Sequence, residues 1–365
     1  MMNRTMTLGA ALLVAVGTIG ASADPREIGD TQVFTVLPAD GPGMPEGIAV
    51  RGDTVYVGTH VSIRGNAGGP PSRVYTFDRT TGMPTGEIVI QGQDQSVNHG
   101  ILAMAFDAAG RLYVVDRNPG RIVRIDLETQ DQETYATIPN LPACRPLVGP
   151  EEDCSPTVAD SATFADYMAF APDGSAYVTD LEAATIFRVP PGGGAAEIWY
   201  QDARFDGVFG LNGIAVDRDQ EYLYFAMTGS QQPTTPAQGI IYRLPLTTES
   251  PAAADLEEFF VYLEPASGPD GLAFGTSGKL YVALAGSNQV SILNPDGTEA
   301  ARFPDAVSNQ FQEVPFDLPA SVAFDGDGSL LVTNQSFFTA VPEHWVVFDV
   351  WVDDTALPLI EPAIP

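Results

Sequence analysis

The feature that most constrains the fold of this chain is a hairpin signature that occurs six times. Each copy has a short apolar strand containing an alanine, a turn rich in Asp and Gly, and a second strand such as Leu112-Tyr113-Val114. The aligned alanines follow one another at intervals of 46 to 64 residues, at Ala49, Ala105, Ala169, Ala215, Ala273 and Ala323. Such a period is typical of four-stranded propeller blades. We therefore predict an all-β fold, a six-bladed β-propeller.

The sixth copy has too few strands to make a complete blade. After its hairpin, only residues 344–352 read as a further strand before the chain ends. We expect residues 31–37 to supply the missing strand, so that the N-terminus closes the ring and no sheet edge stays open. A β-sandwich is the alternative all-β architecture, but sandwiches do not repeat one hairpin signature six times.

The N-terminus has the pattern of a secretory signal peptide. Arg4 precedes an apolar run over residues 8–19, and Ala21-Ser22-Ala23 forms a small-residue cleavage signature. We predict a signal peptide over residues 1–23, a single propeller domain over residues 24–365, and a secreted or periplasmic location. An uncleaved anchor is the alternative, but the run is shorter than the ~20 residues that a membrane-spanning helix needs. We expect no membrane insertion after cleavage.

Charge and cysteine content narrow the choice of partners and compartment. The chain has 47 acidic against 17 basic side chains, a net charge of −30, which repels phosphate backbones and excludes nucleic acid as a partner. This acidity also has a simpler explanation in solubility. Its two cysteines, Cys144 and Cys154, lie in one loop, and in an oxidising compartment this pattern favours a disulfide over two free thiols.

One position in the repeat collects oxygen-bearing side chains. In a propeller the innermost strands line the central channel, so equivalent positions in the six copies form a ring around one axis. The position three residues before each aligned alanine holds Glu46, Leu102, Asp166, Asn212, Asp270 and Ala320. Three of the four polar residues precede a glycine, which we expect to allow tight passage of the backbone near a ligand.

Four oxygen donors on one axis favour a bound cation. Three of them are anionic and would repel one another without one, and an oxygen-only set selects Ca²⁺, or Mg²⁺ or Mn²⁺, over zinc. Asp and Asn also cap turns, and any one of these residues alone would more often be structural. Because the four are in register, we predict a central metal site made by Glu46, Asp166, Asn212 and Asp270.

Three of the ring segments resemble a known family. E-G-I-A-V, N-G-I-A-V-D and P-D-G-L-A-F followed by G-K-L-Y-V-A are similar to motifs of the senescence-marker/gluconolactonase/luciferin-regenerating-enzyme family of six-bladed propellers. The resemblance covers essentially all of residues 24–365. It implies that Glu46, Asn212 and Asp270 bind one divalent metal and that Asp270 is also the catalytic acid/base. The third-blade position is often Asn in this family, so Asp166 departs from the pattern.

A weaker similarity concerns Asn98-His99-Gly100-Ile101, which resembles the His-Gly-Ile stretch of paraoxonase-type lactonases. It implies that His99 is a second candidate for the general base, overhanging the channel mouth. The corresponding partner histidine is not evident, because that strand end reads Val115-Asp116-Arg117. A solvated loop histidine is the alternative reading. His60, at the end of another strand, could reach the same region, whereas we expect His344 to be structural.

These observations predict a metal-dependent hydrolase of a lactone or related ester. The cation would polarise the carbonyl, and Asp270 or His99 would transfer the proton. Two rivals stay open: phosphotriester hydrolysis at the same centre, and a non-catalytic ligand-binding propeller with a structural ion. No Gly-x-Ser-x-Gly motif occurs, which argues against a serine-hydrolase mechanism. We expect substrate specificity to reside in loops such as the cysteine loop and residues 233–238.

Overall fold

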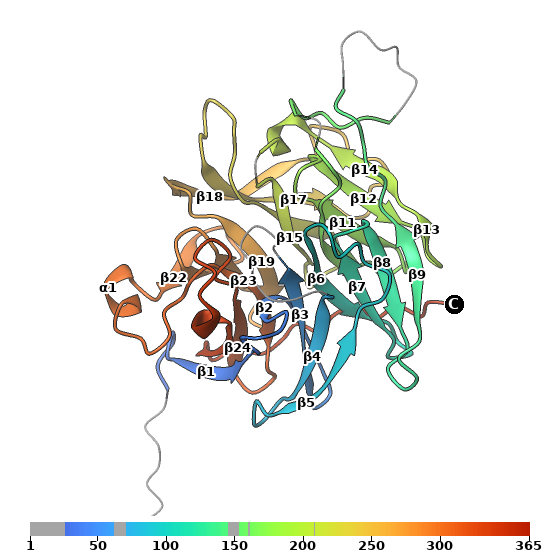
Figure 1. The fold of residues 1–365 in the computed structure, drawn as a ribbon. Coiled ribbons are helices and arrows are strands. Elements are labelled where there is room, and N and C mark those ends of the chain that lie inside the picture. Colours follow the sequence, from blue (N-terminus) through green and yellow to red (C-terminus); the bar gives the residue numbers. More distant parts are fainter. Residues whose placement is uncertain (1–25, 62–70, 145–152, 160, 208) are drawn as a thin grey trace, which may run out of the picture.

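The structure is a computed structural model that describes residues 26–365 except 62–70, 145–152, 160 and 208. Nearly all of its regular structure is antiparallel β-sheet (Figure 1), and the predicted signal peptide lies outside the described residues. The short helical elements are η1 (Ala203–Phe205), α1 (Ala306–Asn309) and η2 (Pro342–His344). None of the described helices combines the length and apolar character needed to cross a membrane.

The first three copies of the hairpin signature each open a run of four strands. Unit one contains β2 (Met44–Arg51), β3 (Thr54–Val61), β4 (Arg73–Asp78) and β5 (Pro84–Val89). Unit two contains β6 (His99–Phe106), β7 (Leu112–Asp116), β8 (Arg121–Ile125) and β9 (Gln132–Thr137). Unit three contains β10 (Ala165–Phe170), β11 (Ala176–Asp180), β12 (Thr185–Val189) and β14 (Glu197–Gln201), with the short β13 (Gly194–Ala195) added beside β9.

The last three copies follow the same plan. Unit four contains β15 (Leu211–Val216), β16 (Tyr222–Met227), β17 (Gln238–Pro245) and β18 (Glu257–Pro265). Unit five contains β19 (Pro269–Phe274), β20 (Leu280–Leu284), β21 (Gln289–Leu293) and β22 (Glu299–Phe303). Unit six contains β23 (Pro319–Phe324), β24 (Ser329–Asn334) and β25 (Val346–Trp351), and its fourth strand is the N-terminal β1 (Thr31–Val36). The predicted pairing of the N-terminal strand with the last unit is thus present.

The first strand of every unit packs against the first strand of the next. β2 packs against β6, β6 against β10, β10 against β15, β15 against β19, β19 against β23, and β23 against β2. Figure 1 shows β2, β6, β15, β19 and β23 gathered around the middle of the molecule. Units one and two also share one sheet, because β3 pairs with β6, with His60 opposite Gly100. The prediction of an all-β, propeller-type fold is confirmed.

The repeated Tyr and Phe of the signature explain how the units adhere. The tyrosine of one second strand packs edge-on against the phenylalanine of the following unit's first strand, and the ring centroids are 5.1 Å apart in all four instances. These pairs are Tyr56–Phe106, Tyr113–Phe170, Tyr224–Phe274 and Tyr281–Phe324. Edge-to-face aromatic pairs contribute about 0.5–1.5 kcal/mol each beyond their buried area. At the junction of units three and four, Val216 stands where the other units have phenylalanine. There Tyr177 packs against Trp199 of its own unit.

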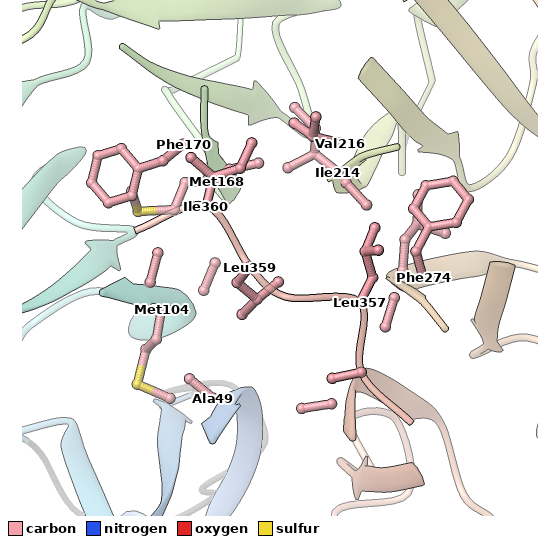
Figure 2. Close-up of a pocket in the computed structure, with 18 of the residues that line it drawn as sticks. Ala49, Met104, Met168, Phe170, Ile214, Val216, Phe274, Leu357, Leu359 and Ile360 are labelled. Carbon is pink, nitrogen blue, oxygen red and sulfur yellow. The ribbon is translucent and has the colours of Figure 1, made fainter. Parts of the chain in front are cut away.

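The C-terminal segment after β25 crosses one end of the axis. It leaves unit six, hydrogen-bonds to unit five through the Leu357 amide and the Phe274 carbonyl, and reaches unit two, where the Ala108 amide donates to Pro362. Between these anchors it spans an apolar cavity of about 470 Å³, lined by the inner strands and by Leu357, Leu359 and Ile360 (Figure 2). This "apolar cavity" therefore lies inside the ring and is partly covered by the protein's own C-terminus.

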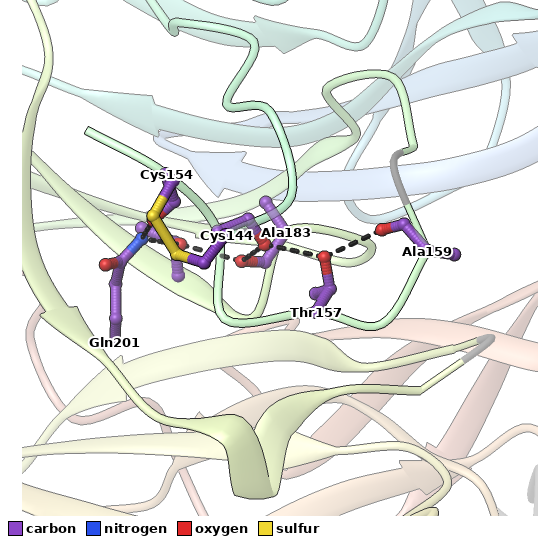
Figure 3. The surroundings of a disulfide bond; sticks show 8 residues. Cys144, Cys154, Thr157, Ala159, Ala183 and Gln201 are labelled. Carbon is purple, nitrogen blue, oxygen red and sulfur yellow. Dashed lines mark hydrogen bonds between the residues drawn. A yellow bond between two sulfur atoms is a disulfide. The ribbon is translucent and has the colours of Figure 1, made fainter. Parts of the chain in front are cut away.

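The cysteine loop is fastened to unit three. Cys144 and Cys154 form the predicted disulfide. Next to it, the Gln201 side chain donates to the Cys154 carbonyl at 2.9 Å, and the Ser155 hydroxyl donates to the Ala183 carbonyl at 2.7 Å (Figure 3). These contacts pin the described part of the loop to the outer strands of the unit and not to the axis.

Candidate active site

Each inner strand has an irregularity at the ring position. The pairing of the first and second strands shifts register in all six units, and each shift brackets one ring residue. The bracketed residues are Glu46, Leu102, Asp166, Asn212, Asp270 and Ala320. A β-bulge turns a side chain away from the regular alternation and is common beside active sites. The bulges thus explain why one position per repeat can point along a shared channel.

The four polar ring residues meet in one cavity. Glu46, Asp166, Asn212 and Asp270 line a space of about 690 Å³, together with the ring residue Leu102. This "acidic cavity" lies on the other side of the ring layer from the apolar cavity, and its size is within the usual range for small-molecule sites. The structure therefore brings together all four side chains that the sequence placed on one ring.

The glycines after three ring residues allow neighbouring inner strands to pack closely. A β-carbon added at Gly213 would come within 2.1 Å of the Asp270 carbonyl oxygen, and one at Gly271 would come within 2.7 Å of the Ala320 carbonyl oxygen. The close neighbour in each case is the backbone of the next inner strand. The expected tight passage of the backbone is present, and it lets neighbouring inner strands contact each other around the axis.

The three carboxyl groups are buried and act on one another. Burial raises the pKa of Glu46 well above its usual range, and the nearby Asp270 and Asp166 raise it further. Burial, with Asp270 second, likewise raises the pKa of Asp166. The positive charge of Arg117 lowers both pKa values. The pKa of Asp270 is raised by burial, although a hydrogen bond from the Tyr167 hydroxyl opposes this.

Unpaired acceptor atoms show what this cavity lacks. Within the part of the chain that the structure describes, Glu46 Oε2, Asn212 Oδ1 and Asp270 Oδ1 are buried without a hydrogen-bond partner. Asn212 Nδ2 donates to Thr228 Oγ1 at 3.1 Å, and Thr228 in turn donates to the Pro269 carbonyl at 2.9 Å. This chain fixes the amide so that its oxygen is the free end. Buried acceptors without partners are costly, and a hard cation would satisfy all three.

The acidic side chains do not by themselves form a complete metal site. Among the described residues, no set of three or more His, Cys, Asp or Glu side chains is close enough together to hold an ion as it stands. The donor chemistry and the unpaired oxygens therefore fit a divalent cation, whereas a ready-made coordination shell is not present.

The two histidines at the β3–β6 junction have different surroundings. His60 lines the acidic cavity, and its Nε2 is 2.9 Å from the Arg117 guanidinium. Burial, followed by Arg117 and His99, lowers the pKa of His60 well below its ordinary value. His99 is completely buried, is not among the residues lining the cavity, and bonds through Nδ1 to the Val97 carbonyl at 2.8 Å. The role of His99 as general base stays a prediction without a contact to the cavity.

Sequence reasoning missed two side chains at this site. Arg117 stacks on the Phe164 ring, with its central carbon 3.5 Å from the ring centroid, and its charge faces Glu46 and Asp166. Tyr167 is buried, lines the apolar cavity, and shares a hydrogen bond with Ser321 of unit six. A hydrogen bond from its hydroxyl also acts on the Asp270 carboxyl group, which lines the acidic cavity. Its one sequence signal is a tyrosine where three other units have glycine.

Comparison with known proteins shows which family resembles this propeller-type protein. Residues 159–336 match the family described as "SMP-30/Gluconolactonase/LRE-like region". Pentonolactonase XacC of Haloferax volcanii is 26% identical over 248 residues, which cover 61% of this chain and 77% of the relative. The resemblance to the senescence-marker/gluconolactonase/luciferin-regenerating-enzyme family is therefore confirmed over residues 159–336, and one relative of this chain is named as a lactonase.

Solved structures agree on the fold. The calcium-binding protein regucalcin from Agrobacterium tumefaciens has a TM-score of 0.61 at 16% identity, over 92% of this chain and 98% of its own. A luciferin-regenerating enzyme has a TM-score of 0.59 at 13% identity, over 88% and 96%. A gluconolactonase from Xanthomonas campestris has a TM-score of 0.55 at 15% identity, over 88% and 89%. At these identities the likeness concerns the fold alone.

Proposed function

We propose that this protein is an exported hydrolase of lactones or related esters that depends on a divalent cation, Ca²⁺ or else Mg²⁺ or Mn²⁺, and that its units form a six-bladed propeller around the cation. The observation that carries the proposal is the convergence of three buried carboxyl groups and one oriented amide oxygen in a single cavity. The relative named as a pentonolactonase supports the reaction class. The cyclic packing of the six inner strands supports the blade count.

The charge balance of the acidic cavity favours a bound cation. Glu46, Asp166 and Asp270 together carry three potential negative charges, and Arg117 supplies one positive charge against them. Buried charges without partners are strongly unfavourable. We assign Glu46, Asp166, Asn212 and Asp270 to hold the cation, which would supply Lewis-acid polarisation of the substrate carbonyl.

The protein's own groups would manage the proton. Hydrolysis adds water to the carbonyl carbon, breaks the acyl carbon–oxygen bond, and moves one proton from the water to the leaving alkoxide. Asp270 lines the cavity beside the other residues assigned to the cation, and we assign its carboxyl group to accept that proton and return it. The Tyr167 hydroxyl holds the same carboxyl group from the opposite side of the ring. The product is the open-chain hydroxy acid.

The test compares Asp270→Asn with the unchanged protein on a panel of lactones, after treatment with EDTA and with or without added Ca²⁺. We expect turnover to require the cation, and the variant to lose at least ~100-fold in kcat/KM, because general acid–base groups contribute about 10²–10⁴-fold. Undiminished turnover by Asp270→Asn would refute the assignment. Absence of divalent-cation binding in calorimetry would refute the metal-dependent proposal. Cation binding without turnover of any lactone or ester would favour the non-catalytic alternative, and faster turnover of phosphotriesters would favour the other rival.

Export is proposed on the predicted signal peptide and is supported by the disulfide, since such bonds persist in oxidising compartments. Mass spectrometry of the protein recovered outside the cytoplasm tests it. We expect a mature N-terminus at Asp24 and no free thiol. A chain retaining residues 1–23, or one confined to the cytoplasm, would contradict the proposal.

A further inference from the structure

The acidic cavity has a mouth built from aromatic rings. Four rings line it in an unbroken row, each in contact with the next. His60 stacks on Phe337 at 5.4 Å, Phe337 contacts Phe338 at 5.2 Å, and Phe338 contacts Phe209 at 6.0 Å between centroids. All four residues line the cavity. We call this row the aromatic wall.

Part of the aromatic wall is open to solvent although it is apolar. Phe338 is 66% exposed and Phe209 is 37% exposed, whereas most large apolar side chains of the ring are buried. Exposing aromatic surface at the rim of a polar site is unfavourable unless a ligand covers it. These rings line the same cavity as the carboxyl groups, which indicates that the ligand is the substrate.

The loop that presents Phe337 and Phe338 is held in a defined conformation. The Asp317 carboxylate accepts hydrogen bonds from the Ser336 hydroxyl at 2.7 Å and the Thr339 hydroxyl at 2.5 Å, and contacts His344 Nδ1 at 2.8 Å. Ser336 itself adopts the left-handed conformation, with φ of 52°. Such backbone conformations are unfavourable outside glycine and persist where surrounding contacts enforce them. The aromatic wall is therefore preorganised.

The hydroxyl groups of the remaining lining are already engaged. Besides the ring residues and His60, its hydrogen-bonding side chains are Thr228, Ser230, Gln231 and Gln335, and the hydroxyls of Thr228 and Ser230 bond within the protein. Thr228 bonds to Asn212 and Pro269, and Ser230 bonds to Thr235. Sugar hydroxyls placed against the aromatic wall would be buried on apolar surface without partners, which is unfavourable. An apolar substituent meets no such penalty.

We propose that the lactone or ester hydrolysed at this site carries an apolar substituent, aromatic or branched alkyl, that packs on the aromatic wall, in place of the hydroxyl groups of a sugar lactone. This inference rests on the proposed function and names its substrate class. It separates this chain from its relative named as a pentonolactonase. The carboxyl groups would handle the reacting carbonyl, and Phe209, Phe337 and Phe338 would select what is attached to it.

The test measures kcat/KM for γ-phenyl-γ-butyrolactone and for a pentono-1,4-lactone in three proteins: the unchanged chain, Phe338→Ala, and the control Phe311→Ala. Phe311 is 83% exposed and is not among the residues lining the cavity, so its removal changes aromatic surface elsewhere. We expect the unchanged protein to favour the phenyl lactone at least ~10-fold. Phe338→Ala should lose about 10-fold on it, as expected for one aromatic contact, and less than 2-fold on the sugar lactone. Phe311→Ala should match the unchanged protein.

Binding of γ-phenyl-γ-butyrolactam, which resists hydrolysis, provides a readout independent of turnover. Calorimetry should give tighter binding to the unchanged protein and to Phe311→Ala than to Phe338→Ala. A preference for the sugar lactone, or equal lactam binding by both variants, would overturn the inference while leaving the hydrolase proposal intact. If neither lactone is hydrolysed but the lactam binds as described, the hydrolase proposal fails and the aromatic wall still binds apolar rings. If the lactam does not bind, the inference fails as well.

Discussion

Thr228→Val should weaken cation binding without disrupting the fold. Thr228 Oγ1 accepts from Asn212 Nδ2 at 3.1 Å and donates to the Pro269 carbonyl at 2.9 Å. Valine keeps the branched shape but removes both hydrogen bonds. Without the acceptor at Thr228, the Asn212 amide is free to rotate, and its oxygen is no longer held toward Glu46 and Asp270.

The magnitude follows from these two contacts. Two lost hydrogen bonds at about 0.5–1.5 kcal/mol each predict a loss of about 1–3 kcal/mol in the free energy of unfolding. Groups that orient a metal ligand typically contribute 10–100-fold to affinity, so Ca²⁺ should bind about 10–100-fold more weakly. This corresponds to about 1.4–2.8 kcal/mol of binding free energy. Titration calorimetry gives the affinity, and denaturant unfolding in EDTA gives the stability.

Thr179→Val is the matched control. Thr179 also hydrogen-bonds to the ring layer: it donates to the Asn212 backbone carbonyl at 2.7 Å and, at 3.4 Å, to the Tyr167 carbonyl, and it accepts from the Tyr167 amide at 3.1 Å. It touches no side chain assigned to the cation. The two variants should lose similar stability, but Thr179→Val should keep its Ca²⁺ affinity within about 3-fold. Equal affinities in both variants would refute the idea that Thr228 acts by orienting the amide.

Two further predictions concern the neighbours of the site. Tyr167→Phe removes a hydrogen bond that lowers the pKa of Asp270, so the pKa of Asp270 should rise. The acidic limb of the pH–rate profile should then move to higher pH. An unchanged limb would show that the bond does not act on the proton-transferring group. Replacing Cys144 and Cys154 together by serine opens a loop closed over a sequence separation of 10, which should cost about 2–3 kcal/mol of stability in denaturant unfolding. Because this loop is fastened to the outer strands of unit three, the Ca²⁺ affinity of that double variant should not change.

The sequence predicted those features of the fold and the site that arise from the repeat. Its Tyr and Phe positions recur because they form the contact between neighbouring units, as in Tyr113–Phe170 and Tyr281–Phe324. The same alignment located Glu46 and Asp270 on a shared ring, since equivalent residues in a cyclic array face one axis. The bulges that turn these side chains were not predictable, because a bulge is a property of two paired strands.

Side chains outside the repeat could not be placed in this way. Arg117 follows a second strand, yet it faces Glu46 in another unit. His99 was expected at the channel mouth from its spacing, but it is buried, and the pairing of β3 with β6 sets it opposite Val61. That pairing joins two units and leaves no trace in a repeat that describes single units. Phe338 depends on a loop shaped by Asp317, 21 positions away in the sequence.

The acidic cavity combines two kinds of structure whose origins differ. Its floor comes from one bulged position in each inner strand, where contacts to the next strand leave little room for change: even a β-carbon at Gly213 would collide with the Asp270 carbonyl. Its aromatic wall comes from connections between strands, where Phe338 and Phe209 contact each other and solvent. The floor can therefore keep one reaction while the wall changes which molecule undergoes it. This is why a lactonase family relative defines the chemistry that we propose more closely than it defines the substrate.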